Sequence, residues 1–183
     1  MVVSMKRIVK TAGKQVRRFL NSNPRRLAGQ QPDPYAVRGA WTGPAVCKEC
    51  YAIYQKKRWR FDESAYADLV GKKGTKAVIC PACLKTRESA AEGVLTLRWP
   101  GLPGHRRDVL GLLRKEAARA RDVNPLERII KIEDEGSELR VFTTNTKLAQ
   151  RMGREMERAY HGKVHYHWSH QDKLVRVYWE RTA

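Results

Sequence analysis

Two short cysteine motifs constrain this chain more than any other feature of its sequence. Cys47-Lys-Glu-Cys50 and Cys80-Pro-Ala-Cys83 contain all four cysteines, and 29 residues separate them. A Cys-x2-Cys turn places two thiolates at a separation that suits one tetrahedral ion, and two such turns complete a closed four-sulfur site. The usual separation of the turns is about 15–20 residues. The intervening segment 51–79 is therefore expected to form a long finger.

The four thiols predict a structural zinc ion held by Cys47, Cys50, Cys80 and Cys83. A closed site leaves no open position for a substrate, so the metal is expected to shape the chain and not to catalyse a reaction. Two disulfides and a redox-active dithiol are the alternatives. No secretory signal is recognised ahead of the motifs, which does not favour an oxidising compartment. Iron fits the same ligands as zinc.

The charge of the chain indicates a polyanionic partner. Its 183 residues include 37 Lys and Arg against 19 Asp and Glu, a net charge of +18. Nucleic acid and an anionic membrane are the two kinds of partner that fit such an excess. No apolar run reaches the roughly 20 residues of a membrane span, so a membrane partner is not favoured.

The excess is uneven and follows the domain division that the sequence suggests. A basic N-terminal helix and linker, 1–46, carries +8, and a zinc ribbon with its long finger, 47–100, carries +5. A connecting helix, 101–123, carries +3, and a C-terminal domain, 124–183, carries +2. The first two segments are therefore expected to contact phosphates.

An amphipathic helix is expected over residues 5–20, because apolar side chains recur there at helical spacing and basic ones fill the other side. Residues 22–46, rich in proline and glycine, are expected to be a linker. The helix could dock on RNA or protein, lie on a membrane surface, or act as a transit peptide. A merely solvated tail is the fourth interpretation.

The finger contains a basic run around one aromatic residue, Lys56-Lys57-Arg58-Trp59-Arg60. Such a run suits RNA, because cations bind phosphates and an indole can stack on a base. In the alternative interpretation Trp59 packs on the ribbon and the lysines are solvated. A helix capped by Asp62 over 63–70, a turn at 71–74 and a strand over 76–79 are expected to complete the finger.

A linker is predicted at 99–104, because this segment contains two Pro-Gly pairs. A helix is expected after it, at 108–122. The C-terminal pattern then predicts two strands, a helix and two strands, so the fold class is α+β with a ββαββ domain. The expected helix packs on a four-stranded sheet and ends with Gly162 in the left-handed conformation. Its expected apolar face consists of Leu148, Met152, Met156 and Ala159. The strands are expected at 128–133, 138–143, 163–168 and 173–179, and the helix at 145–160.

Three other groups of polar residues are candidate sites. Four histidines between 161 and 170 could form a second metal site, although surface or RNA-facing imidazoles fit better without a nearby carboxylate. The acidic run 133–135 falls in an expected hairpin turn and is interpreted as solvated. A stripe of Arg151, Arg154 and Arg158 could contact RNA or face solvent. No phosphate-binding loop, nucleophile elbow or zinc-hydrolase helix is present in the sequence.

Together the paired knuckles and the C-terminal pattern resemble a known family. Beside the knuckles, the resemblance is carried by Leu126–Glu133, Val141–Thr144, the run Leu148–Tyr160 and Arg176–Trp179. These features are similar to small bacterial zinc-ribbon proteins that are distantly similar to the archaeal and eukaryotic export adaptor of the large ribosomal subunit. The chain has one four-cysteine set where the adaptor family has several metal knuckles. The resemblance therefore implies ribosome or ribosomal-RNA binding and does not imply nuclear export.

The resulting prediction is a cytoplasmic, non-enzymatic zinc-ribbon protein that binds ribosomal RNA as a hibernation or assembly factor, with a ribosomal protein as a second candidate partner. It would take no small-molecule substrate. A DNA-binding regulator and a nucleic-acid-processing enzyme are the rival functions. The residues expected to contact RNA are basic or aromatic: Lys6, Arg7, Lys10, Lys14, Arg17, Arg18, Arg25, Arg26, Lys56, Lys57, Arg58, Trp59, Arg60, Lys72, Lys73 and Lys76.

Overall fold

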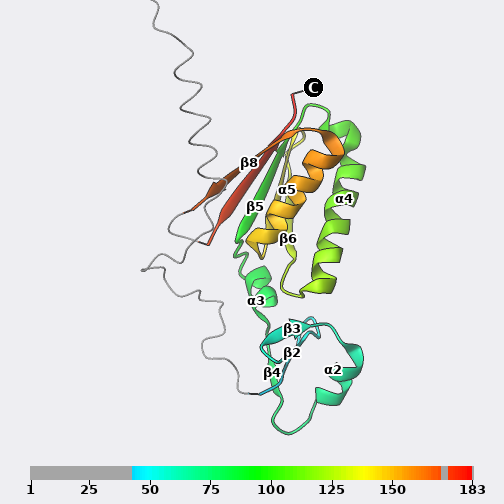
Figure 1. Cartoon of the computed structure of the whole chain (residues 1–183), viewed down its shortest axis with the longest axis vertical. Coiled ribbons are helices and arrows are strands. Elements are labelled where there is room, and N and C mark those ends of the chain that lie inside the picture. The colour runs from blue at the N-terminus through cyan, green and yellow to red at the C-terminus, as the bar shows by residue number, and fades with distance from the viewer. Residues whose placement is uncertain (1–42, 170–172, 183) are drawn as a thin grey trace, which may run out of the picture. The chain divides into compact units, whose positions relative to one another are not determined.

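The computed structural model describes residues 43–169 and 173–182, which form a mixed α/β structure with two sheets and four helices (Figure 1). The expected helix at 5–20 and nearly all of the expected linker lie outside these residues. Eight of the basic residues expected to contact RNA lie outside them as well: Lys6, Arg7, Lys10, Lys14, Arg17, Arg18, Arg25 and Arg26.

The smaller sheet contains the finger and has the strand order β3-β2-β1-β4. Its strands are β1 (Ala45–Cys47), β2 (Ile53–Gln55), β3 (Arg58–Arg60) and β4 (Lys76–Val78). The helix α2 (Glu63–Leu69) begins where the sequence predicted, because the Asp62 carboxylate accepts a hydrogen bond from the Ala65 amide at 3.0 Å. Strands β1 and β4 pair in parallel, and this pairing brings the two cysteine motifs together.

The larger sheet has five strands where the sequence predicted four. Its order is β6-β7-β5-β9-β8, and the unpredicted strand β5 (Gly93–Arg98) lies at its centre. Strand β5 pairs with β7 antiparallel and with β9 in parallel. It therefore belongs to the larger sheet, although it falls within the range 47–100 that was assigned to the zinc ribbon. The other strands are β6 (Ile129–Asp134), β7 (Glu138–Thr143), β8 (Lys163–Trp168) and β9 (Val175–Glu180).

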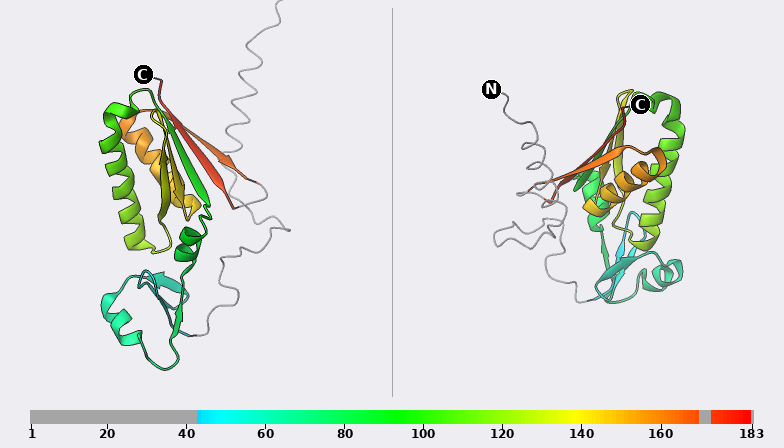
Figure 2. Two further views of the ribbon diagram at one scale, coloured as in Figure 1. Left: turned by 180° about the vertical axis from the view of Figure 1, so that it is seen from behind. Right: turned by 45° about the horizontal axis from the view of Figure 1, so that its top comes forward.

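Two long helices cover one face of this sheet, α4 (Leu102–Val123) and α5 (Thr146–Tyr160) (Figures 1 and 2). The expected start of α4 at residue 108 and the expected linker to residue 104 were wrong, since the helix begins at Leu102. Pro103 is tolerated there because the first turn of a helix needs no amide donor from it. Trp99, also expected in that linker, is 5 % exposed and packs in the core.

The core lies between the helices and the larger sheet. The inward side chains of α5, Leu148, Met152 and Met156, are fully buried as predicted, whereas Ala159 is exposed. They pack on alternate residues of the central strands, as the two-residue period of a half-buried strand requires. Those strand residues are Leu95, Leu97, Leu139, Val141, Val175, Val177 and Trp179.

The end of α5 differs from the prediction in one detail. His161, and not Gly162, adopts the left-handed conformation, with φ of 56°. Histidine is one of the non-glycine residues that visit this region most often. Gly162 has a different reason to lack a side chain, because a Cβ there would lie 2.4 Å from the indole of Trp179.

Candidate metal centre and nucleic-acid interface

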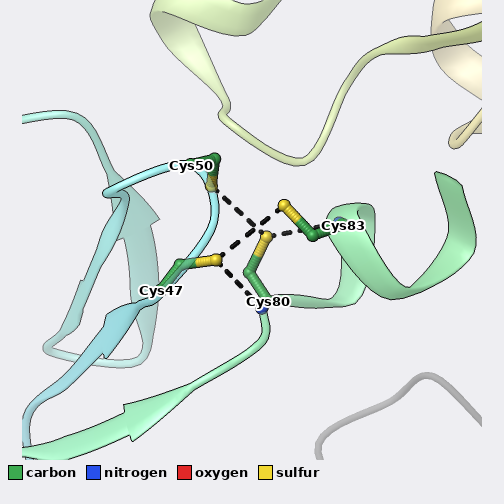
Figure 3. Close-up of side chains that lie close together, drawn as sticks. All are labelled: Cys47, Cys50, Cys80 and Cys83. Carbon is green, nitrogen blue, oxygen red and sulfur yellow. Dashed lines mark hydrogen bonds between the residues drawn. The ribbon is translucent and has the colours of Figure 1, made fainter. Parts of the chain in front are cut away.

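Four backbone segments bring the cysteines together (Figure 3). Cys47 is the last residue of β1, and its carbonyl accepts a hydrogen bond from the Tyr51 amide at 3.2 Å, which closes the turn that carries Cys50. Cys80 caps α3 (Pro81–Arg87), and Cys83 lies in the first turn of that helix. Because Cys47 pairs with Val78 across the parallel strands β1 and β4, the second motif begins beside the first.

The four sulfur atoms have the spacing of a tetrahedral metal site. They all lie within 4.8 Å of one another, and no other group of three or more potential metal ligands occurs in the described part of the chain. The Sγ atoms of Cys47 and Cys83 are 3.8 Å apart, and those of Cys50 and Cys80 are 3.6 Å apart. Sulfurs at about 2.3 Å from a central ion form a tetrahedron with edges of about 3.8 Å. All four residues are free thiols, so the cluster fits a metal ion.

The surroundings of the cysteines shift the pKa values of the individual thiols in opposite directions, and hydrogen bonds with Cys50 and Cys80 lower the pKa of Cys47. The amides of Cys80 and Cys83 donate to the sulfurs of Cys47 and Cys80 at 3.3 and 3.4 Å, which stabilises thiolates. Burial, however, raises the pKa of Cys83 to about 12, and hydrogen bonding with Cys47 raises the pKa of Cys80. A bound ion removes this penalty, because a metal-coordinated thiol is deprotonated outright.

Arg128 contributes a positive charge to the cluster from outside the finger. Its Nη2 donates to the Cys50 sulfur at 2.9 Å, its Nη1 to the Cys83 sulfur at 3.3 Å, and its Nε to the Pro125 carbonyl at 2.7 Å. Burial disfavours the charged guanidinium, but the hydrogen bond with Cys50 and the nearby sulfurs outweigh it and raise the pKa of Arg128. Sequence reasoning missed this role, since Arg128 lies 45 residues after Cys83 and outside any ligand-spacing rule.

Further contacts join the cysteine cluster to the larger sheet. Leu126 packs against the buried residues around the cysteines. Lys85 of α3 is 8 % exposed, forms a 2.5 Å ion pair with Glu92 and donates to the Thr144 carbonyl at 3.4 Å. The segment preceding β6 therefore contacts the metal site at more than one point.

The basic run of the finger forms a tight hairpin. Strands β2 and β3 are joined by the two residues Lys56 and Lys57, which have φ of 50° and 63° and are both exposed. Two consecutive residues with positive φ define a type I′ turn, in which Asn and Gly are strongly preferred. Lysine at these two positions is therefore expected to lower the stability of the folded hairpin. The other basic finger residues of the expected interface are exposed as well: Arg58, Arg60, Lys72, Lys73 and Lys76.

Trp59 differs from its basic neighbours. It is 8 % exposed and packs in the cluster around the cysteines, with its ring centroid 5.4 Å from that of Tyr54. A base could stack on this ring only if the ring left the cluster. The alternative of packing on the finger therefore describes Trp59 in this structure, and a contact of Trp59 with RNA stays a prediction.

The acidic run 133–135 and two of the three arginines of α5 form ion pairs, whereas the histidines of β8 are exposed. Glu133 and Glu135 form ion pairs with Arg140, and Asp134 with Arg106. Arg151 is bound to Glu127 at 2.5 Å and to Glu116 at 3.2 Å, and Arg158 to Glu155 at 2.9 Å. His165 and His167 are exposed on β8, and His170 lies outside the described residues.

Within 43–169 and 173–182, no helix combines the length and the apolar character that crossing a bilayer requires. Comparisons of the chain with protein-family models, with curated proteins and with solved structures find no match. The site must therefore be interpreted from its own chemistry.

Proposed function

We propose that this chain is a zinc-binding, non-enzymatic RNA-binding protein that associates with the ribosome through ribosomal RNA, as a hibernation or assembly factor in the cytoplasm. The observation that carries the proposal is the hairpin tip, where Lys56 and Lys57 occupy two left-handed positions and face solvent. Strained residues at a surface tip are a reason to look for a function, because the strain has no structural benefit of its own.

The charges of the finger support a polyanionic ligand. Within the described residues, Lys56, Lys57 and Arg58 have no ion-pair partner, and neither do Lys72, Lys73 and Lys76, which lie between α2 and β4 or at the start of β4. Six unpaired cations on one finger repel one another, and phosphates relieve that repulsion when they bind. Binding to nucleic acid explains why the charges are gathered there.

Zinc is the metal proposed for the cluster. Four thiolates in a closed tetrahedron are the usual ligands of structural zinc, and the ion would hold β1, β4 and α3 in the arrangement that presents the hairpin. The cysteines would supply binding and orientation, and Arg128 would balance part of the negative charge of a four-thiolate centre. No step of chemistry is assigned to the metal.

The ribosome is proposed as the partner because of the family resemblance and the positive charge of the chain. The test is sedimentation of the tagged, metal-loaded protein through a sucrose gradient at several salt concentrations, with and without RNase, and with DNA as a competitor. We expect the protein to migrate with ribosomal particles, to be released by RNase, and to be displaced more weakly by DNA than by ribosomal RNA.

A matched pair of variants makes the test specific to the hairpin. Lys56→Gln with Lys57→Gln removes two exposed cations from the hairpin, and Arg114→Gln with Lys115→Gln removes two from the exposed side of α4. The hairpin variant should bind ribosomes less tightly and reduce the logarithmic salt slope by about 1–2, whereas the α4 variant should match the wild type. Equal effects of the two variants, or no ribosome binding by the wild type, would refute the proposal.

A further inference from the structure

Among the described residues, 43–169 and 173–182, no helix covers one face of the larger sheet. Both α4 and α5 lie on the opposite face (Figure 2), and alternate residues of all five strands point away from them. This open face contains a shallow hollow of about 580 Å³, whose lining includes Val94, Phe142, Arg176 and Tyr178. Its side chains fall into three rows that run across the strands, because directly paired residues point to the same side.

The first row contains cations and an aromatic ring but no acid. Strand pairing aligns, from β6 to β8, Lys131, Phe142, Val94, Arg176 and His167. The Lys131 ammonium lies 4.6 Å from the centroid of the Phe142 ring and is also paired with Glu133 of the next row. Arg176 is exposed and forms no ion pair with any residue that the structure describes.

The second row adds another ring. It aligns Glu133, Arg140, Thr96, Tyr178 and His165. Tyr178 is half-buried and lies one row from Arg176 on the same strand, β9. The acid of this row, Glu133, is at its far end and is paired with Lys131 at 2.6 Å. Two rings and an unpaired arginine are therefore gathered over the central strands.

The third row contains two acids and two cations and has no net charge. It aligns Glu138, Arg98, Glu180 and Lys163, and Arg98 is bound to Glu138 at 2.7 Å and to Glu180 at 3.4 Å. The two acids of this row are thus both engaged by one arginine. The net positive charge of the open face therefore lies in the first row, beside the ring of Phe142 and next to Tyr178, whereas the second and third rows are neutral.

We propose that the first two rows bind single-stranded RNA, with bases stacked on Phe142 and Tyr178 and a phosphate bound by Arg176. The inference rests on the proposed function and deepens it by naming the form of RNA and the surface that binds it. A sheet that displays aromatic rings beside cations is a recurrent way to bind unpaired bases, whose faces are free. A duplex keeps its bases stacked on each other and offers these rings nothing to stack on.

The test uses the full chain with its metal and a 5′-labelled 12-nucleotide oligouridine, with an RNA duplex of equal length for comparison. Phe142→Leu with Tyr178→Leu keeps apolar bulk and removes both rings, and Phe142→Tyr with Tyr178→Phe keeps both rings. Arg176→Gln removes the unpaired cation, and Arg119→Gln removes an exposed cation of α4 as its control. Circular dichroism verifies the fold of each variant, and a 4-thiouridine probe maps the contact in the wild type.

We expect the leucine variant to bind the single strand about 5- to 100-fold more weakly with an unchanged salt slope, because stacking does not release counterions. The ring-preserving variant should bind like the wild type. Arg176→Gln should lower the slope by about 0.7, the value for one phosphate of a single strand, and Arg119→Gln should not. The cross-link should fall in β7 or β9.

Three results would overturn the inference while the proposed function stands, provided that the wild type binds RNA. The first is that the leucine variant binds oligouridine as tightly as the wild type does. The second is that the 4-thiouridine cross-link lies only in the finger. The third is that the wild type binds the single strand and the duplex with equal affinity. If the wild type binds neither RNA nor ribosomes, the proposed function fails and the inference fails with it.

Discussion

The Nη2 atom of Arg128 lies 2.9 Å from the Sγ atom of Cys50, although the two residues are 78 positions apart in the chain. Arg128 directly precedes β6, an edge strand of the larger sheet, whereas Cys50 belongs to the finger. This hydrogen bond joins the metal centre to the segment that leads into the larger sheet. Its strength is expected to exceed that of a neutral hydrogen bond, because both partners are charged when a metal is bound.

Replacement of Arg128 should weaken metal binding. Arg128→Gln removes the cation that contacts two sulfurs, and loss of such an outer-shell partner typically lowers metal affinity about 10- to 100-fold. Arg128→Lys should be intermediate, because it keeps the charge and loses the two-pronged geometry. Zinc competition against a chromogenic chelator measures the effect, with Arg119→Gln as the control. An affinity of Arg128→Gln equal to that of the control would show that the contact is incidental.

Removal of the metal should unfold the finger. The purified chain is expected to contain one zinc ion, and structural zinc supplies an apparent binding energy of about 10–16 kcal/mol in small zinc modules. Strands of three residues have little core of their own, so a chelator should abolish their amide-exchange protection. Added zinc should restore the wild type but not Cys80→Ser. Protection that survives complete metal removal would contradict a structural role for the ion.

Residues that suit the turn at the hairpin tip should stabilise the protein and weaken its binding to RNA. Lys56→Asn with Lys57→Gly supplies the residues that a type I′ turn prefers, and relief of two left-handed lysines should stabilise the protein by about 1 kcal/mol or more. The same variant should bind RNA more weakly, since it loses two cations. Lys56→Gln with Lys57→Gln should bind equally weakly without the gain in stability. Denaturant unfolding and RNA titration measure the two effects. Unchanged RNA affinity in both variants would show that the strained lysines do not contribute to RNA binding.

Gly162→Ala should lower the stability of the fold. The Cβ of Gly162→Ala would lie 2.4 Å from the buried indole of Trp179, and such overpacking destabilises by about 1–3 kcal/mol. Gly111→Ala is the control, because Gly111 is an exposed residue inside α4 with no atom within 4 Å of an added Cβ. That control should stabilise the protein by about 0.5–1 kcal/mol. Thermal unfolding distinguishes them, and equal stability of Gly162→Ala and wild type would show that the indole can move aside.

The sequence predicts the parts of this structure that depend on local spacing. Four cysteines in two motifs identify the metal cluster, and Asp62 before an apolar repeat identifies α2. The burial of Trp59 could have been inferred too, because exposed Arg58 and Arg60 flank it with the two-residue period of a strand.

Features set by distant pairing could not be predicted in the same way. Strand β5 is short and follows a cysteine motif, so its place at the centre of the other sheet depends on partners far along the chain. The start of α4 was missed because Pro103 and Gly104 favour a linker when no tertiary contact is known. The role of Arg128 and the rows of the open face depend on the register of the folded strands, which no single segment specifies.

The parallel pairing of β5 with β9 has a consequence for the order in which the protein can be made. Arg98 and its neighbour on β9, Glu180, are separated by 82 residues, so the middle strand leaves the ribosome before its second partner exists. At about 5–20 residues per second this interval is about 4–16 s. A nascent chain that stops before residue 175 has all four cysteines but neither Arg176 nor Tyr178, and one edge of β5 remains unpaired. Translation past β9, which ends at Glu180, is therefore a condition for the open face to exist.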